Sequence, residues 1–429
     1  MFRQSLPCAK RNRSRTGSGD SPLWYHAPTR ELPSSEHVAA PSDRSGDGRR
    51  PGVPAGKWGD EMCHLLWKRI RLAVLLAALA APAPLTGAVA ASGTARSPYQ
   101  AIDLSPTEQG IAVANAISGA GLMAGYADSE GLVKYHSWTP AIFVRGGFTT
   151  LGVVPGYIFG DITGINDAGQ AVGWSTTAVG PVPGVTHATL FENGRATDLG
   201  VLPGGTASEA MAINAAGDAV GFSTTAEGQQ TRAVLFSHGA VIDLGSLPGA
   251  TYTVATALNN RGQAVGYAYF ASATAMHAVL FAGGTVTDLG LLPGGSNSAA
   301  YGINDLGQIV GMADLSLNVD RAALFENGTV RNLGTVPGGT YSVASGINNW
   351  GQIVGTSDGG TLGFNPAVFE NGTASFLPVL PGDLFGNALA INDAGDIVGG
   401  CSFFPESAPQ HAVLWTLAHQ FGLPGRVGR

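Results

Sequence analysis

One stretch of sequence recurs seven times along this chain of 429 residues, and the repeat limits what the chain can fold into. The clearest copy covers residues 197–239 and contains the core Ala-Ile-Asn-x-x-Gly. The core recurs at steps of 48, 48, 45, 45, 44 and 44 residues, at Ile117, Ile165, Ile213, Leu258, Ile303, Ile347 and Ile391. Short apolar runs separated by Gly and Asn turns at this period indicate repeated β units, whereas helical repeats would show a 3.6-residue apolar stripe.

Each unit holds four apolar segments, which we expect to be strands A, B, C and D. In the clearest copies they cover residues 210–214, 218–223, 232–236 and 286–292. Turns ending in glycine join A to B and C to D, because glycine accepts the positive φ that a tight hairpin needs. A Pro-Gly-Gly sequence follows strand D and fits a type II turn. The pattern predicts a four-stranded antiparallel meander for each unit.

The number of strands predicts how the array closes. Strand C occurs seven times, the last copy at 411–415 lacks a following D strand, and a spare D-like segment lies at 99–104. We therefore predict an all-β fold over residues 97–417, a seven-bladed β-propeller of four-stranded repeats about 45 residues long. The N-terminal strand would complete the last blade and close the ring, which leaves no open edge. Strand A, rich in Ala and Gly, would be innermost.

The first 90 residues have a different composition. Residues 1–61 are rich in Arg, Ser, Pro and Gly and lack apolar periodicity, so we expect a disordered leader and a misassigned start. Residues 62–90 have the order of a secretory signal peptide, with basic residues at 68–71, an apolar run at 72–81 and a small-x-small site ending at Ala90.

We therefore predict a chain that begins near Ala91 and is secreted. Prolines at 82 and 84 interrupt the apolar run too early for a membrane-spanning helix. Residues 418–429 would form a C-terminal tail.

The net charge limits the classes of molecule that the chain can bind, and the cysteine content limits its disulfides. Residues 91–429 hold 10 Lys and Arg and 23 Asp and Glu, a net charge of −13, with Lys134 as the only lysine. Such a surface disfavours nucleic acid and anionic membranes. We expect a monomer that inserts into no membrane once the signal is cleaved. Of the three cysteines only Cys401 lies in this part, so we expect no intrachain disulfide and a small buried residue rather than a nucleophile.

Three recurring motifs resemble a known family. They are the His-Ala-x-Leu-Phe strand, as at 187–191, the Asp-Leu-Gly-x-Leu-Pro-Gly-Gly link, as at 288–295, and the Ile-Asn-x-x-Gly core. Residues 97–417 are similar to the HAF-repeat family of bacterial extracellular repeat proteins. Here the third letter is Thr or Val, and Arg232 and Arg321 replace the histidine in two copies. The resemblance implies a bacterial protein that is exported to the cell exterior or the periplasm and has a repeat architecture, and it supplies no catalytic residue.

Comparison of the copies with one another indicates where a ligand would bind. The A–B and C–D turns are uniform, whereas the B–C loops vary in length and sequence, and hairpin parity puts these loops on the same face as the D–A links. Variable loops on a rigid scaffold are where binding usually occurs; drift in surface loops is the alternative. Aromatic residues stand near this face, four residues after the link proline or close by, and we take them as candidate ligand-binding residues: Trp138, Tyr157, Phe159, Tyr252, Tyr341 and Phe385. They could stack on sugar rings, or fill gaps between blades.

Other recurring polar residues are better explained by a structural role than by ligand or metal binding. The His or Arg that opens strand C, as at His187, should hydrogen-bond to the backbone of a neighbouring blade, because sevenfold geometry keeps these side chains too far apart for one metal ion. The Asn-Asp-x-Gly turns lack the acidic spacing of a calcium loop. We identify no catalytic motif and expect no metal or cofactor. The sequence favours a non-catalytic binding or surface-interaction module, possible ligands being an extracellular polysaccharide or surface glycan; the alternative is a secreted hydrolase or lyase acting on carbohydrate or lactone.

Overall fold

The computed structural model describes residues 97–105, 111–128, 138–177, 184–226, 230–316, 319–360, 363–403 and 410–418. The predicted leader and signal peptide lie outside these ranges, as does the predicted tail after Ala418. Within them no helix is both long and apolar enough to cross a membrane.

The described residues form 28 strands, which fall into the four predicted types. The A strands are β2 (Ala112–Ile117), β6 (Phe159–Ile165), β10 (Ser208–Ile213), β14 (Tyr252–Leu258), β18 (Ser298–Ile303), β22 (Ser342–Ile347) and β26 (Phe385–Ile391). The B strands are β3 (Met123–Ala127), β7 (Ala171–Thr176), β11 (Ala219–Thr224), β15 (Ala264–Phe270), β19 (Ile309–Asp314), β23 (Ile353–Asp358) and β27 (Ile397–Ser402). The C strands are β4 (Thr139–Val144), β8 (Thr186–Glu192), β12 (Thr231–Ser237), β16 (Ala275–Ala282), β20 (Asp320–Glu326), β24 (Phe364–Glu370) and β28 (Gln410–Leu417). The D strands are β1 (Tyr99–Asp103), β5 (Gly147–Thr150), β9 (Arg195–Gly200), β13 (Ala240–Asp243), β17 (Thr285–Asp288), β21 (Thr329–Asn332) and β25 (Thr373–Phe376).

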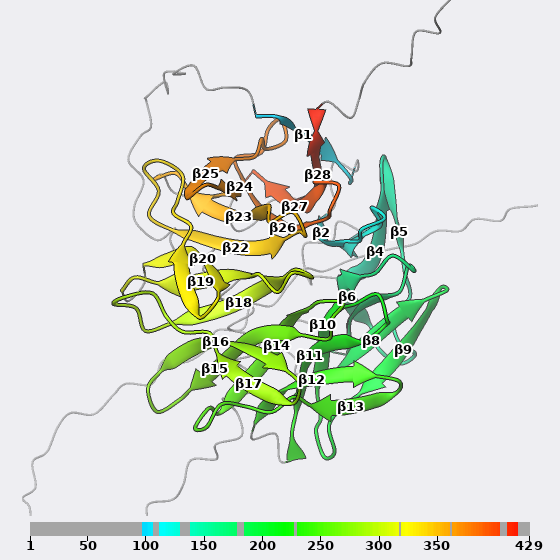
Figure 1. Ribbon diagram of the computed structural model, residues 1–429. Helices are drawn as coiled ribbons and strands as arrows, with labels where there is room; N and C mark the ends of the chain where they lie inside the picture. The colour runs from blue at the N-terminus through cyan, green and yellow to red at the C-terminus, as the bar shows by residue number, and fades with distance from the viewer. Residues whose placement is uncertain are drawn as a thin grey trace, which may run out of the picture. The chain divides into compact units, whose positions relative to one another are not determined.

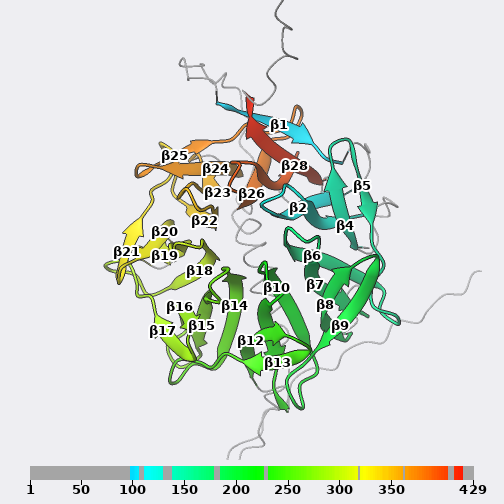
Figure 2. The same ribbon diagram turned by 45° about the vertical axis from the view of Figure 1, so that its right-hand side comes forward.

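These strands pair as antiparallel meanders in the order A, B, C, D, as the sequence predicts (Figure 1). One single parallel pair, Thr231 with Tyr252, joins β10–β13 and β14–β17 into an eight-stranded sheet. The last meander takes its D strand from the other end of the chain: β1 pairs with β28 along its whole length, Tyr99 opposite Leu417 and Asp103 opposite Val413 (Figure 2). The fold is therefore a propeller-like array of four-stranded antiparallel units.

A bulge in each A strand explains a glycine that recurs in strand B. The register between β10 and β11 shifts between Ala210 and Ala212, and Gly221 lies opposite the shift. A Cβ on Gly221 would lie 1.9 Å from the carbonyl oxygen of Glu209, a distance that no side chain tolerates. The same arrangement recurs in the other B strands, so the Val-Gly or Ala-Gly pair of the repeat is a requirement of the bulge.

The links after strand D follow the predicted turn chemistry, with one correction. In the Leu202–Gly205 link the N–H of Gly205 donates to the oxygen of Leu202 at 2.8 Å, and Gly204 has φ +76°, as a type II turn requires. The prediction that strand D runs over 286–292 is wrong at its end, since β17 stops at Asp288. The N–H of Leu289 still donates to the oxygen of Ala278 at 2.9 Å, and at Gly290, which has φ +86°, the backbone leaves the extended region and the sheet.

Successive sheets pack face to face through small and apolar side chains. One core cluster joins Val172 and Ala188 of β6–β9 to Ala210, Val234 and Phe236 of β10–β13. The phenylalanine near the end of strand C is buried in this way in most units, and Trp415 takes its place in β28. Neighbouring A strands approach closely: a Cβ on Gly302 would lie 3.4 Å from the Cα of Gly346. The predicted crowding of the A strands is present between these sheets.

Candidate functional site

The D–A links lie against the ends of the B strands, at the edge where the B–C loops leave the sheet. The N–H of Leu202 donates to the hydroxyl of Ser223 at 2.9 Å, and the N–H of Thr206 donates to Thr224 at 2.8 Å. Carboxylates take the same role in later copies, where Asp314 accepts from Ser296 at 2.7 Å and Asp358 accepts from Thr340 at 2.6 Å. Links and B–C loops thus share one edge, as hairpin parity predicts. We call this edge the loop face.

Two of the candidate aromatics sit at the start of an A strand and lie against other rings. Tyr252 stacks on buried Tyr267, with centroids 6.2 Å apart. Tyr341 meets Phe364 edge to face at 4.9 Å. Both tyrosines are half-buried, and burial raises the pKa of Tyr341 well above its ordinary value, with Asp320 and Asp358 adding to the effect.

The other four candidates are also half-buried. Trp138 packs between Tyr126 and Trp174, at 5.4 and 5.9 Å. The ring of Phe385 lies directly over Gly363, where a Cβ would overlap it. Phe159 begins β6, opposite Thr176. The structure therefore spreads the candidates over several sheets of the loop face, each against its own neighbours, instead of gathering them around one cavity.

Tyr157 lies in a small polar group on the same face. Its ring is 5.8 Å from that of His187, whose Nδ1 is 2.6 Å from a carboxylate oxygen of Asp198. Burial, with a contribution from Asp198, raises the pKa of Tyr157. An aromatic hydroxyl, an imidazole and a carboxylate side by side could hydrogen-bond to a polar ligand.

The histidines that open strand C correct a second expectation. His187 and His277 bond to an aspartate of their own D strand, Asp198 at 2.6 Å and Asp288 at 2.7 Å, and not to the backbone of a neighbouring blade. His411 bonds to Asp383 at 2.9 Å. In the copies of His187 and His277 the aspartate is close because it lies on the strand paired with that of the histidine and faces the same side of the sheet, a cross-strand relation that linear spacing does not reveal. In the copies with arginine, only Arg321 donates to the following link, at the oxygen of Thr340.

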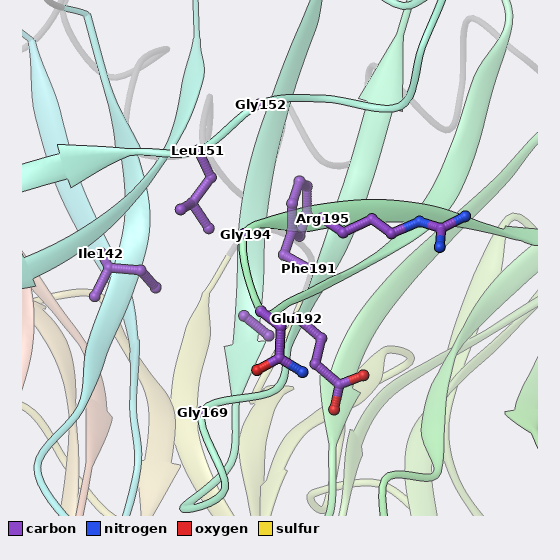
Figure 3. A pocket seen from close by; sticks show the side chains of 10 residues that line it. Ile142, Leu151, Gly152, Gly169, Phe191, Glu192, Gly194 and Arg195 are labelled. Atoms are coloured by element: carbon purple, nitrogen blue, oxygen red, sulfur yellow. The ribbon is translucent and has the colours of Figure 1, made fainter.

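Two shallow hollows lie at the opposite edge, which carries the A–B and C–D turns and which we call the turn face. One, of about 160 Å³, is lined by Ile142, Leu151 and Phe191 with Glu192 and Arg195 (Figure 3). Arg195 points away from the three apolar side chains in this view.

The other hollow, of about 290 Å³, lies between Leu122, Val144 and Leu414 and is bordered by Asp396. One buried carboxylate oxygen of Asp396 has no hydrogen-bond partner among the described residues. The described residues contain no cluster of three His, Cys, Asp or Glu that could hold a metal ion.

The asparagine of the Ile-Asn-x-x-Gly core has a role that sequence reasoning missed. It is buried, and its Oδ1 caps its own turn: Asn304 accepts the N–H groups of Leu306 at 3.1 Å and Gln308 at 2.9 Å. Its Nδ2 reaches the following sheet and donates to the oxygen of Asn348 at 3.0 Å. Asn166, Asn259, Asn348 and Asn392 make the same cross-sheet bond, the last to Ser118 at 3.2 Å. We call this series the asparagine ladder.

The next residue of each turn adds a second series of bonds. The carboxylate of Asp393 accepts the backbone N–H of Asn349 at 2.8 Å and its side-chain amide at 2.9 Å. Asp305 accepts from Asn260 in the same way. The aspartates of the Asn-Asp pairs, which superficially suggest a calcium loop, thus hydrogen-bond to the turn of the adjacent sheet. The turn face is consequently well ordered by hydrogen bonds.

Cys401 is buried in the core of the last sheet. Burial raises the pKa of its thiol to about 12, with Asp383 and Asp103 adding to the effect and a backbone hydrogen bond opposing it. A thiol that stays protonated at neutral pH is a poor nucleophile. Its position fits the expected structural role.

No protein-family model and no characterised protein matches the sequence. Among solved structures, an oligogalacturonate lyase in complex with manganese is similar over 75% of this chain and 93% of its own, with 12% identity and a TM-score of 0.46. TolB from Acinetobacter baumannii is similar over 58% of this chain and 64% of its own, with 10% identity and a TM-score of 0.36. A gluconolactonase from Xanthomonas campestris is similar over 54% and 82%, with 12% identity and a TM-score of 0.32. At this identity the likenesses carry nothing about a ligand or a reaction.

Proposed function

We propose that this chain is an exported, non-catalytic binding module, a seven-bladed β-propeller closed by its N-terminal strand, which binds an extracellular polymer on its loop face. Polysaccharide is the first class of polymer to test. The observation that carries the binding proposal is the contrast between the two faces. Bonds tie successive turns of the turn face together, while the loop face is the edge at which the B–C loops, which differ in sequence and length, leave the sheets beside half-buried aromatic rings.

Closure is supported by contacts between the first and last units. Beside the pairing of β1 with β28, a core cluster joins Val398 and Leu414 of the last sheet to Met123 and Phe143 of the first. The bond from Asn392 to Ser118 continues the asparagine ladder across the same junction. Seven four-stranded units that contact end to end in this way would leave no unpaired interface between sheets.

The binding proposal is tested by screening the exported domain against a glycan array and soluble polysaccharides. The double variant Tyr252→Ala with Tyr341→Ala should lose affinity for the polymer found, because stacking on one aromatic is worth about 1–3 kcal/mol in the comparable case of nucleic-acid bases. Full affinity in a folded double variant would show that these two rings do not bind the polymer. Unfolding of the double variant would mean that they are packing residues.

Export is tested separately. Mass spectrometry of the chain recovered from the medium or periplasm of the native host should find an N-terminus near Ala91. A peptide from residues 1–61 in that material would contradict both the signal peptide and the proposed start.

A further inference from the structure

The A–B turns differ at one position in a way that their fold does not require. The third residue of the turn is alanine in four of the seven copies, at 120, 168, 216 and 394. In three consecutive copies it is instead Arg261, Leu306 and Trp350. Since the turn forms with alanine, these larger side chains are not needed to make it.

The larger side chains are exposed. Trp350 has 76% of its surface accessible and Leu306 has 61%, the two highest values among the large hydrophobic side chains of the described residues. Arg261 is exposed as well. Hydrogen bonds run from Asn260 to Asp305 and from Asp305 to Asn349, so the three turns are adjacent along the turn face.

The indole of Trp350 is held in place despite its exposure. Its Nε1 donates to the carbonyl oxygen of Asp393 in the following turn, at 2.9 Å. Its backbone N–H donates to Oδ1 of Asn348 at 3.1 Å, and Asn349 is bound twice to the Asp393 carboxylate. The polar edge of the ring is therefore satisfied inside the protein, and a flat apolar surface remains in water. A ligand that stacks on it meets a ring already ordered, which lowers the entropic cost of binding.

We propose that Trp350, with Leu306 in the preceding turn, is a stacking platform for the pyranose rings of a neutral polysaccharide. The apolar patch is small: an aromatic side chain buries about 150–250 Å², whereas a stable protein partner needs about 800 Å² on each side. One indole face matches the apolar face of a sugar ring, and the guanidinium of Arg261, one turn beyond Leu306, can donate to the hydroxyls of a further sugar unit of the same polymer. The net charge of −13 over residues 91–429 disfavours an acidic polymer.

This inference rests on the proposed class of ligand but places a contact on the turn face, away from Tyr252 and Tyr341. The experiment uses the full-length chain with soluble β-glucan, xylan and mannan, by affinity electrophoresis and hydroxyl-radical footprinting. At least one polysaccharide should bind and protect the peptide containing Trp350 from oxidation. Trp350→Ala should weaken that binding about tenfold or more, as expected for one lost stacking contact. Trp350→Phe, which keeps a ring, should retain most of it.

Two controls separate the outcomes. Ile242→Ala removes another exposed apolar side chain, on β13, and should leave binding unchanged. If Tyr252→Ala with Tyr341→Ala abolishes binding while Trp350→Ala does not, the platform is wrong and the loop-face proposal stands. The platform proposal is also overturned if a polysaccharide binds without protecting Trp350 from oxidation. It is overturned as well if only a proline-rich peptide protects Trp350. If no polysaccharide binds, the platform and the polysaccharide form of the proposed function both fail.

Discussion

The asparagine ladder makes the sharpest prediction about stability, at Asn304. Its side chain is 4% exposed and makes four hydrogen bonds, two inside its turn through Oδ1, one to Gln308 through Nδ2 at 2.9 Å, and one to the following sheet. Asn304→Ala removes all four and leaves buried groups unpaired. At a net value of about 0.5–1.5 kcal/mol for each of the four bonds, the free energy of unfolding should fall by about 2–6 kcal/mol.

The first unit of the chain suggests a graded variant. Ser118 holds the equivalent position, and its hydroxyl accepts the N–H of Leu122 at 3.2 Å. Asn304→Ser should therefore keep part of the turn and lose the bond to the next sheet, with a loss near half that of the alanine variant. Asn332→Ala is the matched control, because Asn332 is exposed and caps Gly334 at 2.8 Å.

Urea unfolding with linear extrapolation gives the differences. If Asn304→Ala costs no more than Asn332→Ala, the ladder contributes nothing to stability and the reasoning is refuted.

Three further predictions follow from the packing. Deleting residues 97–104, which contain β1, should lower the melting temperature far more than deleting 418–429, and equal values would contradict the pairing of the chain ends. Cys401 should resist alkylation at pH 8 until the protein unfolds, because burial raises its pKa to about 12, so the thiolate that reacts is scarce in the folded state; peptide mapping after labelling checks this. Gly311→Ala should cost about 3 kcal/mol, since its Cβ would lie 2.0 Å from a carbonyl oxygen of β18, against about 1–2 kcal/mol for Gly328→Ala at φ +72° in an open turn; thermal unfolding of both variants compares them.

Much of the fold could be predicted because it depends on local chemistry that repeats. The type II turn at Pro203 and Gly204 needs only the residues that form it, and seven copies make the strand order unambiguous. The pairing of β1 with β28 followed from counting strands. The end of strand D was missed because the backbone leaves the extended region at Gly290, whose φ of +86° is not visible in the apolar periodicity of the sequence.

The candidate site was less predictable because its contacts cross from one strand or sheet to another. The partner of His187 is eleven residues away in sequence but on the neighbouring strand, and the acceptor of Asn304 lies one repeat further on. The sequence marked the aromatics near the links, yet their half-burial depends on rings such as Tyr267 and Phe364 that pack beside them. The sequence did not identify Trp350 as a candidate, because a single large residue in a uniform turn becomes informative only when its exposure is known.

The pairing of β1 with β28 also has a consequence for biosynthesis. Tyr99 leaves the ribosome more than 300 residues before its partner Leu417, so β1 stays unpaired while every other sheet is being made. Each of those sheets can form from neighbouring segments as they emerge. The last sheet, in contrast, must pair with a strand at the far end of the nascent chain. Contacts of such long sequence separation form slowly because the intervening chain must first be brought together. The final fold is therefore reached only after translation has passed Leu417, and until then the backbone groups of β1 are open to other strands.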